Sequence, residues 1–261
     1  MVKLSELLTF FESVAPAALA EDYDNVGLLV EGVTDEISTV VLALDADAQT
    51  VESAAAQGAE LIVTHHPVMF RPVNRLTEAD GGQRTLRRLL QKGIGLFAMH
   101  TNFDSAEGGL CDIFLDSFGE FAERSAFDGT PAGIGRIGRL KAPCALSDLL
   151  NRGKRLYADE STLRYVGDDM AEIKTVAVCN GGGSDLLYDA CRLGADVYIS
   201  GDFKHHHARF AYENKMNLIQ IDHYDAEIAF CAHMQKRLQD AFGDALCVKI
   251  ADYEQSPWRN F

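Results

Sequence analysis

Short apolar runs that end in polar clusters recur along this chain, and they constrain its fold more than any other feature. One such run, Leu61–Val63, leads through Thr64 into His65-His66 and Pro67. A short apolar run of this kind is typical of a buried strand. Because proline cannot donate a hydrogen bond to a sheet, we expect the strand to end at the two histidines.

Stretches with helical spacing separate these runs. Strands expected at 39–44, 60–64 and 94–99 alternate with helices expected at 47–57, 82–92 and 107–118. This alternation predicts a parallel α/β sheet, in which ligands bind at the carboxyl ends of the strands. A Gly/Pro-rich segment at 122–138 is typical of a boundary or an exposed loop. The remaining elements are expected at 4–14, 136–141, 146–155, 163–166, 227–241 and 245–251.

The second half of the chain resembles the first at a constant offset. Gly58-Ala-Glu-Leu-Ile-Val-Thr64 resembles Gly194-Ala-Asp-Val-Tyr-Ile-Ser200, and Thr39 matches Thr175 at the same offset of 136 residues. Polar clusters align as well, because Gly201-Asp202 falls opposite His65-His66. We therefore predict two related α/β lobes that face each other. The first lobe would comprise residues 1–125, completed by about 222–261, and the second 126–221. The sequence leaves open whether the final helix and strand join the first lobe or the second.

Composition excludes several classes of function. The formal net charge of −15 argues against general affinity for nucleic acids or anionic membranes. No apolar run approaches the roughly 18 residues of a membrane span, and Glu6 and Glu12 interrupt the N-terminal stretch that would otherwise resemble a leader peptide. The six cysteines form no CxxC pair. We interpret them as reduced, mostly buried thiols, and we expect a cytoplasmic protein.

Four expected strand ends carry residues that bind metals. They are His65-His66, His100 with Asp104, Asp202 with His205-His206-His207, and the segment from Asp222 to Glu227. Imidazole and carboxylate together suit Zn, Mn, Fe, Co or Ni. Adjacent histidines on an extended segment point to opposite sides, so one metal would not easily take both, whereas two neighbouring metals could take one each. Each cluster alone is also explained by structural or surface histidines, and the His205–His207 triplet by a solvated helix face.

Several of these segments together resemble a known family, the Nif3-like dinuclear metal centre proteins, also named GTP cyclohydrolase 1 type 2 homologues. The resemblance covers nearly the whole chain, in the short form of the family that lacks an inserted central domain. The motifs that carry it are Asp24-Asn-Val-Gly-Leu, Thr64-His-His-Pro, His100-Thr-Asn-Phe-Asp104, Ser200-Gly-Asp202 with His206, and Asp222-His-Tyr-Asp-Ala-Glu227.

The resemblance implies a two-lobed α/β subunit in a toroidal homohexamer. It also implies two divalent transition-metal ions per subunit (Zn, Fe, Mn, Co or Ni), bound in the cleft between the lobes. It assigns the metal ligands to His65, His66, Asp104, His223 and Glu227, with Glu227 bridging the two ions. His100 and Asp202 would lie at the rim of the site or behind its ligands, and His206 near it. Asp222 before His223 departs from the family pattern, which leaves the roles of the supporting residues open.

Three functions are compatible with such a site. The first is a metal-dependent hydrolase of a nucleotide or similar small molecule, in which His100 or His206 transfers protons. Exposed-loop arginines, Arg71 and Arg75, would then either contact a phosphate or simply face solvent. The second is a protein that holds or delivers metal, or a regulatory scaffold, without catalysis. The third, a ring around nucleic acid, fits the acidic charge worst.

Overall fold

The structure is a computed structural model that describes residues 1–157, 163–252 and 256–258. Its contacts divide the chain into unit 1, Met1–Phe103 with Phe230–Gln255, and unit 2, Asp104–Ala229 with Ser256–Phe261. Residues 104–125 fall in unit 2 because Phe114, Leu115 and Phe118 pack into its core. As limits of independently folding domains, the boundaries predicted near 125 and 222 stay predictions.

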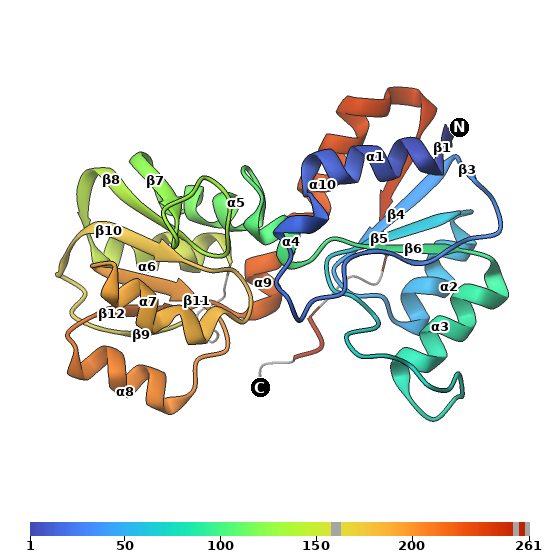
Figure 1. The fold of residues 1–261 in the computed structure, drawn as a ribbon. Helices are drawn as coiled ribbons and strands as arrows, with labels where there is room; N and C mark the ends of the chain where they lie inside the picture. The colour runs from blue at the N-terminus through green and yellow to red at the C-terminus, as the bar shows by residue number, and fades with distance from the viewer. Residues whose placement is uncertain (158–162, 253–255, 259–261) are drawn as a thin grey trace. The chain divides into compact units, whose positions relative to one another are not determined.

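Unit 1 is built on a five-stranded sheet in the order β13-β4-β5-β6-β2, of which Figure 1 labels β4, β5 and β6. The four strands from β13 to β6 pair in parallel, and β2 runs antiparallel to β6 at the edge. A separate pair, β1 with β3, is antiparallel. The strands are β1 (Val2–Lys3), β2 (Gly27–Val30), β3 (Glu36–Ile37), β4 (Thr39–Ala43), β5 (Leu61–Thr64), β6 (Gly95–Ala98) and β13 (Cys247–Ile250).

Local signals in the sequence set the helix limits in unit 1. The Asp47 side chain accepts the Thr50 N–H at 2.7 Å and so begins α2, and Asp80 begins α3 in the same way. After α2, Gly58 takes a positive φ of 74°, which lets the chain turn into β5 as the sequence predicted. The helices are α1 (Leu4–Val14), η1 (Ala17–Leu19), α2 (Ala48–Ala56), α3 (Gly81–Lys92), α10 (Ala229–Phe242) and η3 (Gly243–Ala245), while α4 (Thr101–Ser105) spans the division between the units.

Unit 2 contains a six-stranded mixed sheet in the order β7-β8-β10-β11-β12-β9. Only β10, β11 and β12 are mutually parallel, and β7, β8 and β9 pair antiparallel with their neighbours. Its strands are β7 (Phe121–Ala126), β8 (Arg136–Ala145), β9 (Arg164–Val166), β10 (Glu172–Val178), β11 (Val197–Ser200) and β12 (Asn217–Gln220). Its helices are α5 (Leu110–Asp116), α6 (Leu146–Leu156), η2 (Gly183–Leu186), α7 (Leu187–Arg192), α8 (His205–Glu213) and α9 (His223–Glu227).

The predicted internal repeat is confirmed by topology. Each unit contains three neighbouring parallel strands, β4-β5-β6 in unit 1 and β10-β11-β12 in unit 2. In each unit the last of the three pairs with an antiparallel edge strand that comes earlier in the sequence: β6 pairs with β2, and β12 pairs with β9. The repeat extends to a side-chain contact. Glu60 accepts the backbone N–H of Thr39 at 2.8 Å, and its counterpart Asp196 accepts that of Thr175 at 2.8 Å. The two units are therefore versions of one α/β pattern.

The structure corrects several expected elements. The segment at 122–138 is not simply a loop, because it holds most of β7 and the start of β8. This strand was missed because Glu123 and Arg124 face solvent on a sheet edge and break the apolar run. The helix expected at 107–118 is shorter, and it follows a separate short helix, α4. The helix expected at 227–241 is preceded by another short helix, α9. Among the described residues, none of the helices has the length and apolarity to cross a membrane.

Candidate metal centre

Unit 1 brings three predicted site residues together at the ends of two neighbouring strands. His65 and His66 follow β5, and His100 follows β6, which lies beside it. The ring centroids are 5.0 Å apart for His65 and His66, 5.1 Å for His65 and His100, and 5.4 Å for His66 and His100. One nitrogen from each ring lies within 4.8 Å of the other two, a spacing at which these residues could hold a metal ion.

Each of the three rings is held by an oxygen at its Nδ1 atom. His65 Nδ1 lies 2.8 Å from the carbonyl oxygen of Met99, and His66 Nδ1 lies 3.0 Å from Oδ1 of Asp45. His100 Nδ1 lies 2.9 Å from Oδ1 of Asp24. Because these oxygens accept hydrogen bonds, the proton of each neutral ring resides on Nδ1 and the lone pair on Nε2. Metal-binding histidines are oriented in this way, so the group fits a divalent ion.

Asp24 links the turn before β2 to the histidine group. Besides His100, it accepts the backbone N–H of Thr101 at 3.0 Å and the Thr101 hydroxyl. Burial raises the pKa of the Asp24 carboxyl, but the hydrogen bonds from His100 and Thr101 outweigh burial and bring the pKa well below its usual range. Asp24 is therefore a fixed negative charge behind His100.

Unit 2 places two carboxylates beside the predicted ligand His223. Its Nδ1 lies 2.7 Å from Oδ2 of Asp202, and its Nε2 lies 3.0 Å from Oε2 of Glu227. Burial lowers the pKa of His223, but the two carboxylates overcome this effect and raise it to about 10. The hydrogen bond with His223 in turn lowers the pKa of Asp202. In the protein without metal, an imidazolium therefore supplies the positive charge beside carboxylates that suit a cation.

The backbone near Glu227 makes this arrangement specific. The side chain of Asp222 accepts the Tyr224 N–H at 3.1 Å and so begins α9, where His223 and Glu227 lie four residues apart on one face. Gly181, at φ 57°, lies so close to Glu227 that an added Cβ would be 1.8 Å from Oε1. Only glycine leaves room for this carboxylate.

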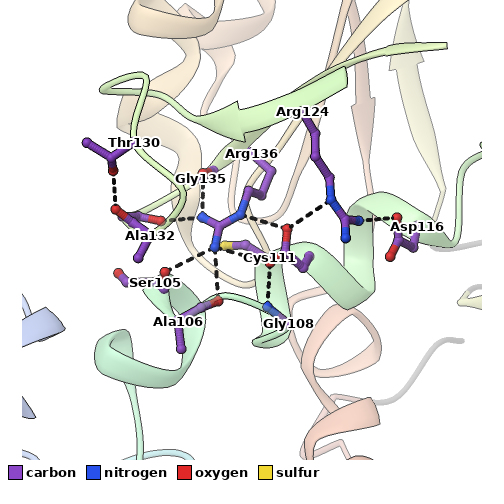
Figure 2. Close-up of polar contacts among 12 residues, drawn as sticks. Ser105, Ala106, Gly108, Cys111, Asp116, Arg124, Thr130, Ala132, Gly135 and Arg136 are labelled. Atoms are coloured by element: carbon purple, nitrogen blue, oxygen red, sulfur yellow. Dashed lines mark hydrogen bonds and ion pairs between the residues drawn. The ribbon is translucent and has the colours of Figure 1, made fainter. Parts of the chain in front are cut away.

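Asp104 occupies the short helix α4, and a buried arginine holds the turn that follows it. Arg136 donates to the carbonyl oxygens of Ser105 at 3.0 Å and Ala106 at 2.9 Å, and to Asp112 Oδ1 at 2.8 Å (Figure 2). Asp112 Oδ2 accepts the N–H of Gly108 at 2.7 Å. Both charged side chains are nearly inaccessible to solvent, with 1% exposure for Arg136 and 5% for Asp112. This network fixes the backbone on the carboxyl side of Asp104.

The predicted site residues thus form two groups, one in each unit. His65, His66 and His100 form the first group, and Asp104, His223 and Glu227 belong to the second. His206 lies exposed on α8, with its ring 4.1 Å from that of His207. Of that triplet, His207 is the buried one, and it accepts the Lys204 N–H at 3.1 Å. Residues 70–80, which include Arg71 and Arg75, are all exposed.

Sequence reasoning missed four residues that shape these groups. Asp45 and Asn180 each follow the first parallel strand of a unit, and Gly181 follows Asn180. Asp24 was part of a motif but had no role assigned. The run Asn180-Gly-Gly-Gly183 directly after an apolar strand was the available signal, because glycines at a strand end indicate a close backbone approach.

Comparison with known proteins identifies relatives of this chain. The family model described as Duf34/NIF3 (NGG1p interacting factor 3) matches residues 2–257. A protein named GTP cyclohydrolase 1 type 2 homolog from Clostridium perfringens is 36% identical over 230 residues, which are 87% of each chain. One of the same name from Streptomyces coelicolor is 31% identical and covers 99% of this chain and 94% of its own.

A solved structure shows the same fold over the full length. The crystal structure of the Staphylococcus aureus protein SA1388 matches with a TM-score of 0.88 and 26% identity, covering 100% of this chain and 99% of that one. The match of the family model over almost every residue decides the classification. The chain belongs to the Duf34/NIF3 family.

Proposed function

We propose that this protein binds two divalent transition-metal ions through His65, His66, Asp104, His223 and Glu227, and uses them to hydrolyse a nucleotide or a similar small molecule. The observation that carries the proposal is the group of three histidines whose Nδ1 atoms are all held by oxygens. That anchoring orients the Nε2 atoms of His65 and His66 as ligands, whereas we assign Nε2 of His100 to proton transfer. The carboxylates around His223 support the same conclusion, because a metal cation can replace the positive charge of the imidazolium between them.

The chemistry of the site would then be divided between the ions and the chain. When bound, a pair of such ions supplies an acidified water and stabilises the developing negative charge of hydrolysis. His100 is the residue that we propose for proton transfer. Asp24 fixes Nδ1 of its ring as the proton-bearing nitrogen, so Nε2 accepts a proton from the attacking water or returns one to the leaving group. His206, exposed at the start of α8, is proposed as a second proton carrier.

Elemental analysis of untagged protein, together with turnover assays, tests the proposal. We expect about two transition-metal ions per chain, and loss of metal in His66→Ala and Glu227→Ala while the fold persists by circular dichroism. The loaded protein is then assayed against a nucleotide panel that includes GTP. His100→Gln should retain metal and lose turnover, because it removes the proton carrier alone.

The possible results distinguish the metal site from the hydrolase activity. Wild-type protein that takes up no Zn, Mn, Fe or Co would overturn the metal site itself. Metal that binds and exchanges without turnover on the whole panel would overturn the hydrolase and favour a protein that holds or delivers metal. Turnover that persists in Glu227→Gln would contradict the assigned ligand.

A further inference from the structure

Asn180 joins two of the proposed metal ligands. Its side-chain nitrogen Nδ2 donates to Oδ1 of Asp104 at 2.8 Å and to Oε1 of Glu227 at 3.3 Å. These carboxylates belong to different short helices, α4 and α9, that are 123 residues apart in sequence (227 − 104). A primary amide nitrogen carries two hydrogens, one for each carboxylate. Asn180 is 3% exposed, so water does not compete readily for these hydrogen bonds.

A buried thiol decides which way the amide points. Sγ of Cys111, on α5, donates to Oδ1 of Asn180 at 2.9 Å, and Cys111 is fully buried. The opposite orientation would turn the amide oxygen toward two carboxylate oxygens and the amide NH2 toward the thiol. That arrangement replaces two attractive contacts with repulsive ones. The orientation of Asn180 is therefore set from both sides, by the carboxylates and by Cys111.

The backbone leaves Asn180 little freedom to move. It lies between Cys179, which ends the apolar run of β10, and Gly181, whose carbonyl oxygen accepts the Gly201 N–H at 2.9 Å. This hydrogen bond joins the turn after β10 to the turn after β11. Asn180 is thus a rigid donor on a strand end, whereas the two carboxylates that it contacts sit on short helices.

We infer that Asn180 is a positioning residue of the proposed metal site. It donates to one oxygen of Asp104 and one of Glu227, and so sets the orientation of both carboxylates toward a metal ion. Cys111 in turn sets the orientation of the Asn180 amide. This inference rests on the metal-binding function proposed above. Hydrogen-bonded partners behind metal ligands contribute to affinity, and their loss commonly costs about 10- to 100-fold. The amide also separates two carboxylates that would otherwise repel each other in the metal-free protein.

Asn180→Asp is the sharpest test, because it changes the amide nitrogen to an oxygen at nearly constant shape. Metal-free protein is titrated with Co²⁺, and its visible absorption reports both affinity and coordination geometry. We expect roughly 10- to 100-fold weaker Co²⁺ binding and a changed absorption spectrum at saturation. A merely structural role for Asn180 would alter thermal stability without altering the spectrum of the saturated protein.

Asn217→Asp is the matched control in the same unit. Asn217 also uses its amide nitrogen, which donates to the Asp196 carbonyl oxygen at 2.8 Å, but it contacts none of the proposed ligands in the described hydrogen bonds. The same change of nitrogen to oxygen there should leave Co²⁺ affinity and spectrum as in wild type.

A second pair of variants covers the case in which Asn180→Asp does not fold. Cys111→Ala removes the donor to Asn180, whereas Cys111→Ser keeps a hydroxyl donor. We expect Cys111→Ala to weaken Co²⁺ binding by about 3- to 10-fold, the effect of one hydrogen bond, and Cys111→Ser to restore most of it. Equal affinity and identical spectra in wild type, Asn180→Asp and Cys111→Ala would overturn the inference alone. Wild-type protein that binds no Co²⁺ would overturn the proposed function as well.

Discussion

At the scale of single residues, Gly181 determines whether Glu227 can occupy its place. We expect Gly181→Ala to displace the Glu227 carboxylate, because its Cβ would lie 1.8 Å from Oε1. Metal content, measured by elemental analysis, should fall to the level of Glu227→Ala. Gly194→Ala is the control, because Gly194 also has a positive φ, of 79°, but nothing lies within 4 Å of its added Cβ. It should cost only the backbone strain, roughly 1–2 kcal/mol, and retain metal. Equal metal content in the two variants would contradict the steric argument.

His223 gives the metal-free protein a specific pH dependence. Its pKa is about 10 in the folded chain and near 6.5 in the unfolded chain. A raised pKa stabilises the fold fully below about pH 6.5, and this contribution disappears as pH rises through about 10. Urea unfolding in EDTA measures this contribution. We expect the free energy of unfolding of wild type to exceed that of His223→Gln at pH 6.5, and the difference to disappear as the pH rises to about 10. A difference in stability that stays constant from pH 6.5 to 10 would refute the assignment.

At the scale of secondary-structure elements, the stability of the region around α4 depends on one buried ion pair. Arg136→Met should destabilise the protein by about 3–5 kcal/mol, because it leaves Asp112 buried without its main partner. It also removes the donors to the Ser105 and Ala106 carbonyl oxygens, so the turn after Asp104 should loosen. Chemical unfolding measures the first effect, and hydrogen exchange at residues 105–112 measures the second.

The matched change on the same strand is Arg139→Met. Arg139 is also on β8 and pairs with Glu123, but both side chains are well exposed, at 66% and 73%. Exposed pairs contribute little, so we expect a change within about 0.5 kcal/mol. Comparable losses in Arg136→Met and Arg139→Met would show that burial of the pair is not what matters.

At the scale of the whole molecule, metal should couple the stability of the two units. Ligands that bind the folded chain alone stabilise it by mass action, by about 2.7 kcal/mol at a concentration 100 times the dissociation constant. If the five proposed ligands serve the same ions, Zn²⁺ should raise the unfolding temperature of both units in calorimetry. His66→Ala in unit 1 and Glu227→Ala in unit 2 should each abolish the whole effect. A shift confined to one unit would contradict the shared ligand set.

The assembly is a second prediction at this scale. The family resemblance implies a homohexamer, so native mass spectrometry of untagged protein should show a six-chain species. The metal-free protein serves as the comparison, since it separates assembly from metal binding. A monomer at all concentrations would contradict the predicted ring.

Much of the fold was readable from local patterns in the sequence. The apolar run before His65 and the spacing of Leu4, Leu7 and Phe11 depend only on neighbouring residues, and both became the predicted elements, β5 and α1. The repeat was also readable, because residues 58–64 resemble residues 194–200 at the same offset of 136 that relates Thr39 to Thr175. The edge strand β7 was not, since a strand exposed to solvent lacks a continuous apolar signal.

The sequence by itself determined which residue types stand at the strand ends, and hence that imidazoles and carboxylates gather where a parallel sheet binds ligands. Tertiary structure alone decided how they are held. Asp24 reaches His100 across 76 residues, and Asn180 reaches Asp104 across the same number. Such contacts follow from strand order and from the packing of short helices, so no local pattern of hydrophobicity or turn chemistry could specify them.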